Sequence, residues 1–194
     1  QDGRIVELSG VDIPDDVAPR AVDFLRDFFK ENPQKNVTVY ITPRPDQGRT
    51  NRFGHDVAHL ARQQDGAWVQ GALIAAGLAR AWPGADTPEL HQKLYEAENK
   101  AIGDAINLWA ADSPHRLYPV SDITGDAHGT HIVQGPIRSV AMVNNVTYLN
   151  FGPDWKTDFT IALPRAIRMA LTKDGVDVLQ LQGKIIRARG WVRS

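Results

Sequence analysis

Three carboxylates lie within five residues near the start of the chain, at Asp12, Asp15 and Asp16. They follow a stretch with strand character that a glycine and a proline interrupt. Oxygen ligands gathered after a strand end are typical of a site for a divalent cation. The same residues could instead form a solvated acidic turn that caps the helix expected from about Ala18.

A second group with chemical potential is the basic, aromatic strand pattern over residues 184–193. Strand alternation sends these side chains to one outer face: Arg187, Arg189, Trp191 and Arg193. A basic strand with a stacking aromatic is typical of OB barrels that bind single-stranded DNA or RNA. Four further residues could extend such a platform: Tyr148, Phe151, Trp155 and Lys156. The alternative is an ordinary amphipathic strand whose arginine stems cover Trp191 and pair with Asp154 or Asp158.

Histidines supply the remaining candidates. His55 and His59 are four residues apart, a spacing that would suit a metal pair on a helix. Because their segment has strand character, we expect two partly exposed histidines on one face rather than a zinc site. Asp126, His128 and His131 could hold a metal, although a plain linker is the simpler interpretation.

Helices and strands that must position these residues can be predicted from periodicity. We expect helices over 18–32, 68–81, 87–109 and 165–172. We expect strands over 37–41, 53–62, 131–143, 146–151, 158–163 and 183–193, with a polar loop at 44–52. Strands with one inserted helix over 131–194 predict a small OB-like barrel.

Composition and charge divide the chain into two parts. Residues 1–113 hold 12 Lys and Arg against 17 Asp and Glu, whereas residues 114–194 hold 10 against 6. A segment rich in Pro, Gly, Ser and Asp separates them. We therefore expect a first domain over 1–112, a linker over 113–130 and a second domain over 131–194, which could be truncated at its C-terminus.

Other classes are excluded by what the sequence lacks. There is no cysteine, so disulfides and thiolate metal sites are excluded. No apolar run is long enough to suggest a membrane span. The chain starts at Gln1 inside a strand pattern, which leads us to expect a processed or trimmed piece.

Four ordered stretches carry a resemblance to a known family. Residues 3–15 are GRIVELSGVDIPD, 51–58 are NRFGHDVA, 68–79 are WVQGALIAAGLA, and Glu98 precedes Leu108-Trp109. In this order they resemble the motifs of the staphylococcal nuclease (thermonuclease) family over about 1–112. The resemblance implies an OB-type barrel with packed helices and calcium-dependent cleavage of DNA and RNA. The expected fold class is therefore α+β or mainly β, with this barrel followed by a second small OB-like β-barrel.

Carrying the family's site over residue by residue gives a mixed result. The metal-binding aspartate falls on Asp12, and the glutamate that handles the attacking water falls on Asp15. The two arginines that stabilise phosphoryl charge fall on Glu7 and His55. A carboxylate repels phosphate and offers no paired donor there. We therefore expect a nuclease-family protein with a degenerate active site.

Three functions stay open on the sequence alone. The favoured one is a module that binds nucleic acid or another protein. An active Ca²⁺-dependent endonuclease is the second, if Arg4 or Arg52 reaches the site and compensates. A structural role in protein–protein assembly is the third. Many family members are secreted, so we expect a periplasmic or secreted location, with the cytoplasm as the alternative.

Overall fold

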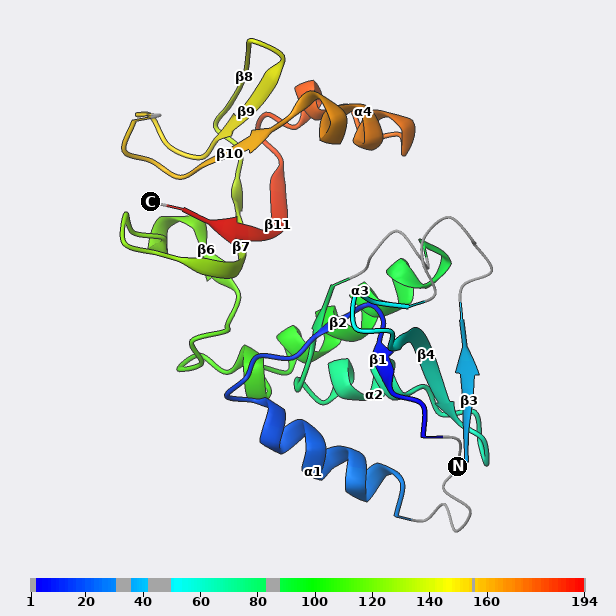
Figure 1. Cartoon of the computed structure of the whole chain (residues 1–194). Coiled ribbons are helices and arrows are strands. Elements are labelled where there is room, and N and C mark those ends of the chain that lie inside the picture. Colours follow the sequence, from blue (N-terminus) through cyan, green and yellow to red (C-terminus); the bar gives the residue numbers. More distant parts are fainter. Residues whose placement is uncertain (1–2, 31–35, 42–49, 83–87, 155, 194) are drawn as a thin grey trace. The chain divides into compact units, whose positions relative to one another are not determined.

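The computed structural model describes residues 3–30, 36–41, 50–82, 88–154 and 156–193 (Figure 1). The chain divides into two compact units, Gln1–Pro114 and His115–Ser194. Helices and strands mix in both, so the predicted α+β class is confirmed. No sheet closes into a barrel within those described ranges. None of the described helices has the length and apolar character needed to cross a membrane.

The first unit contains two small sheets and three α-helices among its described residues. In chain order they are β1 (Val6–Leu8), β2 (Val11–Asp12), α1 (Ala18–Phe28), β3 (Val37–Tyr40), β4 (Asp56–Arg62), α2 (Val69–Ala75), β5 (Arg80–Ala81), α3 (Pro88–Gly103) and the 3-10 helix η2 (Asn107–Trp109). The larger sheet has the order β1-β4-β3, with β1 parallel and β3 antiparallel to β4. The smaller sheet pairs β2 with β5.

The core of the first unit lies around α2 and α3. Leu73, Ile74 and Leu94 are fully buried there. The buried side chain of Gln70 joins α2 to β4: its Oε1 accepts from the Leu60 amide at 3.1 Å and its Nε2 donates to the Ala58 carbonyl at 2.9 Å. These two bonds fix β4, the central strand of the larger sheet, against α2.

Helix α2 is shorter than the predicted helix over 68–81. Gly77 has a φ of 64°, and its amide donates to Ile74 while the Leu78 amide donates to Leu73. This pair of bonds is a Schellman motif, which ends a helix at a left-handed glycine. A Cβ at Gly77 would lie 2.5 Å from the Ile106 carbonyl oxygen. The chain therefore leaves the helix and forms β5, which carries Arg80.

The described residues of the second unit form two three-stranded sheets. Its elements are β6 (Tyr118–Pro119), the 3-10 helix η3 (Val120–Asp122), β7 (Gly129–Pro136), β8 (Ser139–Val143), β9 (Val146–Asn150), β10 (Thr160–Leu163), α4 (Arg165–Lys173), the 3-10 helix η4 (Val178–Gln180) and β11 (Ile185–Val192). The sheet orders are β11-β7-β6 and β10-β9-β8. Because β6 pairs with β7, part of the stretch expected as a linker over 113–130 belongs to a sheet of this unit.

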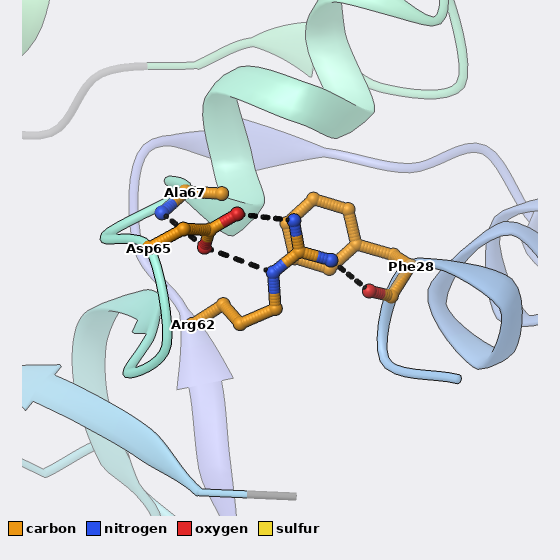
Figure 2. Close-up of polar contacts among 4 residues, drawn as sticks. All are labelled: Phe28, Arg62, Asp65 and Ala67. Carbon is orange, nitrogen blue, oxygen red and sulfur yellow. Dashed lines mark hydrogen bonds and ion pairs between the residues drawn. The ribbon is translucent and has the colours of Figure 1, made fainter. Parts of the chain in front are cut away.

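Residues Arg62 and Asp65 tie helix α1 to the end of β4 (Figure 2). The Arg62 guanidinium donates to Asp65 at 2.9 and 2.6 Å and to the Phe28 carbonyl, and it lies 4.4 Å from the centre of the Phe28 ring. The Asp65 carboxylate also accepts from the Ala67 amide at 3.1 Å. The bonds from Arg62, and then that from Ala67, lower the pKa of Asp65 from 3.8 to about 2.

This cluster predicts a loss of stability in acid. The pKa of Asp65 is lower in the folded than in the unfolded chain, so its contribution is complete above 3.8 and is lost as the pH falls toward 2. We expect Asp65→Asn to lower the denaturation midpoint at neutral pH and the difference from wild type to close over that window. Chemical denaturation followed by circular dichroism against pH measures it. In an Arg62→Gln background the pH-dependent part should largely vanish, and a full effect there would contradict the assignment.

Candidate functional site

Asp12, the predicted metal ligand, forms an ion pair with Arg80. The two residues are directly opposite each other in the β2–β5 pair. Arg80 donates from Nε to Asp12 Oδ2 at 2.8 Å and also from Nη2 to the same oxygen. The Arg80 side chain is 7% exposed and that of Asp12 is 36% exposed. The carboxylate therefore neutralises a buried arginine, and one of its oxygens is already engaged by two donors.

Glu7 and His55 occupy the positions where, according to the sequence resemblance, the staphylococcal nuclease family has two arginines. The side chain of Asn51 joins them. The Asn51 amide donates from Nδ2 to Glu7 Oε2 at 2.5 Å, and the same nitrogen lies 3.5 Å from His55 Nδ1. Glu7 is exposed on β1, and His55 is half-buried just before β4. The arrangement brings an acid, an amide and an imidazole together, and none of the three is a fixed cation.

Asn51 also builds the turn that places His55. Its Oδ1 accepts from the backbone amides of Phe53 at 2.9 Å and His55 at 3.0 Å. The backbone amide of Asn51 donates to the backbone carbonyl of His55 at 2.9 Å. The sequence analysis missed this residue, although an asparagine three residues before Gly54 is a usual signal for such a turn. The strand predicted from 53 consequently begins at Asp56.

Arg4 and Arg52, the arginines that could have compensated, contact other groups. Arg4 Nη1 lies 3.4 Å from Asp56 Oδ2, with 63% of the Arg4 side chain exposed. The Arg52 guanidinium lies 4.7 Å from the centre of the Phe53 ring. Arg4 therefore contacts Asp56, and Arg52 contacts Phe53.

Asp15, the predicted position of the family glutamate, is exposed in the turn before α1. The expected acidic cap on that helix is not observed, because its N-cap residue is Val17 and no side chain caps it. The Pro14 carbonyl instead accepts from the amides of Val17 at 2.9 Å and Ala18 at 3.0 Å. Asp15 is therefore free to face solvent without a structural role in the cap.

A calcium ion fits these residues poorly. Calcium takes six to eight oxygen ligands, usually from several carboxylates. Within the described ranges no group of three or more His, Cys, Asp or Glu side chains is arranged to hold a metal. Arg80 brings a positive charge to Asp12, which opposes a cation there. The donor set therefore does not match the metal site that the family resemblance implies.

His59 differs from its prediction as a partly exposed residue. It is 2% exposed, and Trp68 Nε1 lies 3.3 Å from its Nδ1. The Trp68 and His59 rings are 5.6 Å apart. A Cβ at Gly10 would lie 3.3 Å from His59 Cε1. His59 is thus part of the core of the first unit, because β4 is the central strand of its sheet.

The other histidine candidates lie in the second unit. His131 Nε2 is 3.0 Å from the His128 carbonyl oxygen, and the His131 ring packs edge-on against Tyr118 at 5.4 Å. Asp126 accepts from the Thr124 hydroxyl, which lowers the pKa of that carboxyl. These contacts are local, and they do not gather the three residues into a metal site.

The basic strand β11 pairs antiparallel with β7 over its full length. We define the β11 face as the side of β11 that carries Arg187, Arg189 and Trp191, together with Arg193 just beyond the end of the strand. The register places Gln134 opposite Arg187, Ile132 opposite Arg189 and Thr130 opposite Trp191. Opposite residues of an antiparallel pair share a face, so these three residues of β7 belong to the same surface.

The β11 face is covered at one end and open at the other. Arg187 is half-buried and donates to Gln134 Oε1 from Nε at 3.3 Å and from Nη2 at 3.2 Å. Ile132 is buried, whereas Trp191 is 69% exposed and Arg193 is exposed. The end with Trp191 and Arg193 therefore presents an aromatic ring and a cation to solvent, beside the small side chain of Thr130.

The residues expected to extend this platform are dispersed. Trp155 lies outside the described residues. Lys156 is exposed in a turn, where its amide donates to Asp154 Oδ1 at 3.0 Å. Phe151 packs against Phe159 with ring centres 5.5 Å apart. Tyr148 lies on β9, in the other sheet of the second unit.

The acids offered as alternative partners of the arginines are used locally. Asp158 Oδ2 accepts from the Asp154 amide at 2.7 Å, and the Asp158 amide donates to the Asp154 carbonyl. With the Lys156 contact, these bonds close the turn on itself. The two acids therefore stabilise a turn, and their observed contacts do not neutralise the β11 face.

No protein-family model matches the chain, and no curated protein matches it.

Proposed function

We propose that this chain binds single-stranded nucleic acid through the open end of the β11 face. The observation that carries the proposal is Trp191, which is 69% exposed, with Arg189 two residues before it and the exposed Arg193 two residues after it. Backbone pairing with β7 fixes the position from which the Trp191 side chain extends, and its exposed ring offers a surface on which a base can stack. Arginines at alternate positions would meet the phosphates on either side.

The proposed ligand is single-stranded because stacking needs an accessible base face. Stacking of a base on an aromatic side chain does not require a particular sequence. Arginine contacts to phosphate release counterions, so binding should weaken as salt rises. We therefore expect sequence-tolerant, salt-dependent binding to DNA or RNA single strands and weaker binding to a duplex.

We also propose that residues 1–112 form a staphylococcal-nuclease-like domain with a degenerate active site, and that both units derive from OB-type barrels. For the first unit, two features support this: the mixed sheet β1-β4-β3, and the position of α1 in the chain between β1 and β3. An OB barrel is partly open, so the lack of closure among the described strands is compatible with it. In this proposal the first domain is a scaffold.

The altered site supports loss of catalysis. Removing one preorganised donor to a developing charge costs about 10²–10³ in rate. Here Glu7 and His55 occupy both donor positions, and Asp12 is bound to Arg80. Nothing in this set offers paired donors to a phosphoryl oxygen, so we assign the first unit no phosphodiester chemistry.

Fluorescence anisotropy of a labelled oligothymidylate tests the binding function. We expect saturable binding by the full chain, a linear fall of log affinity with log salt, and weaker competition by a duplex of the same length. Absence of salt-dependent binding would contradict the proposal that this chain binds nucleic acid. A structural role in protein assembly would then be the better account.

Asp12 and Asp15 are the observations that favour a second candidate, an active calcium-dependent nuclease. We predict that plasmid DNA and RNA remain uncut by this chain, with calcium and with chelator alike. Gel electrophoresis after long incubation measures it. Calcium-dependent cleavage that disappears in Asp12→Ala would establish the nuclease and overturn the scaffold role. Cleavage that survives this substitution would indicate a contaminating nuclease.

A further inference from the structure

The hairpin formed by β8 and β9 has one free side. In the described part of the second unit, β8 pairs with β9 alone (Figure 1). The hairpin turns at Asn144 and Asn145, whose φ values are 50° and 65°. Two positive φ values in a two-residue loop define a type I′ turn. Val143 and Val146, which flank this loop, therefore form its hydrogen-bonded closing pair.

The direction of each peptide group in β8 follows from that closing pair. Hydrogen-bonded and non-hydrogen-bonded pairs alternate along an antiparallel ladder. Ala141, two residues before Val143, consequently directs its amide and carbonyl toward β9. Val140 and Met142 direct theirs away from it. The outer edge of β8 thus offers two amides and two carbonyls for pairing with another strand.

The other sheet edges of this unit carry features that discourage such pairing. β6 has two residues and includes Pro119. β10 has four residues and is followed directly by Pro164. β11 carries Arg187 and Arg189. Short length, proline and charge are the usual protections of an edge. β8 has the sequence SVAMV, with five residues, no charge and no proline.

We propose that the outer edge of β8 pairs antiparallel with β8 of a second copy of this chain. The two-fold axis would pass at Ala141, which places Val140 opposite Met142 of the other copy. In this register each Val140 exchanges two hydrogen bonds with the opposing Met142. The arrangement is self-complementary, as a symmetric dimer interface requires. It would join two three-stranded sheets into one continuous sheet.

The side chains agree with this register. Val140 and Met142 lie on one face of β8 and Ala141 on the other, so the dimer would align Val with Met and Ala with Ala. Met142 and Val143 are each 54% exposed. β8 itself carries no charged residue, so no like charges face each other along the paired strands. Uncharged, self-matching residues favour a second copy over a charged peptide as the occupant.

The dimer should be weak. Pairing through one short strand buries less than the ~1,200–2,000 Å² of a standard interface. We therefore expect association that depends on concentration, from monomer at low micromolar to dimer at higher concentration. It does not require nucleic acid, so its outcome is independent of the proposed binding function.

Sedimentation velocity of Met142→Pro against wild type tests the proposal. A proline at 142 removes an amide that faces away from β9, so the hairpin keeps its bonds while an incoming strand loses one and meets the ring. We expect dimerisation of wild type, at least tenfold weaker association of Met142→Pro, and retained association of the control Met142→Thr.

Amide exchange of the wild type gives a second measurement that does not depend on a variant folding. The amides of Val140 and Met142 should exchange more slowly as protein concentration rises, whereas the amide of Phe53 in the first unit, which donates to Asn51 Oδ1, should not change. A wild type that stays monomeric throughout, or a folded Met142→Pro that dimerises as well as wild type, would overturn the proposal. Concentration-independent exchange at both residues would do so as well.

Discussion

Trp191→Ala is expected to weaken binding of a single-stranded oligonucleotide by about tenfold to a hundredfold, because one base stacked on an aromatic side chain contributes ~1–3 kcal/mol. The side chain is 69% exposed, so its removal should leave stability nearly unchanged. Anisotropy titrations of both proteins at one salt concentration measure the ratio. Trp191→Phe keeps a stacking ring and should recover most of the affinity.

Phe53→Ala is the matched control for that substitution. Phe53 is 67% exposed, but it lies in the first unit beside the degenerate site. We expect its removal to leave the affinity unchanged. If Phe53→Ala weakened binding and Trp191→Ala did not, the nucleic acid would bind at the family's original site, and the β11 face would be an ordinary amphipathic strand.

Asp12→Ala is expected to destabilise the first unit by about 2–3 kcal/mol. Removing one partner of a fully buried ion pair costs ~3–5 kcal/mol, and the partial exposure of Asp12 reduces this. The cause is the loss of a carboxylate that pairs with the buried Arg80. Urea denaturation measures the difference. Asp15→Ala, which removes an exposed carboxylate three residues away, should stay within about 0.5 kcal/mol of wild type.

Calcium separates the structural role of Asp12 from a catalytic one. A ligand that binds only the folded state stabilises it by RT ln(1 + [L]/Kd), so the melting temperature rises as the ligand concentration increases. We expect calcium to leave the melting temperature of wild type and Asp12→Ala equally unaffected. A rise in the wild type that is absent in the variant would make Asp12 a metal ligand and would contradict the ion-pair interpretation.

Local sequence signals predicted most helices and strands of this fold. The helix predicted over 165–172 is observed as α4 (Arg165–Lys173), and the strand over 183–193 as β11 (Ile185–Val192). The strand over 131–143 is observed as two strands, because the chain breaks after Pro136 and the Ile137 amide donates to the Lys184 carbonyl. That break depends on a partner distant in sequence, which periodicity does not detect.

The candidate site was harder to predict because its determinants are non-local. Asp12 and Arg80 are 68 residues apart, and Asn51 and Glu7 are 44 apart. The spacing of the carboxylates identified Asp12 and the family resemblance identified Glu7, but neither indicated the partners of these residues. The burial of His59 was not predicted either: it was expected to be partly exposed, whereas the position of β4 in the middle of its sheet buries it.

Photo-crosslinking tests binding through the β11 face most directly. A bromouridine-substituted single strand is irradiated with the full-length wild-type chain, and the crosslinked peptides are identified by mass spectrometry. We predict adducts on the peptide containing Trp191, with competition by unlabelled single strands and loss at high salt. Adducts confined to residues 50–62 of the first unit, or none under conditions where binding is saturated, would contradict the proposal.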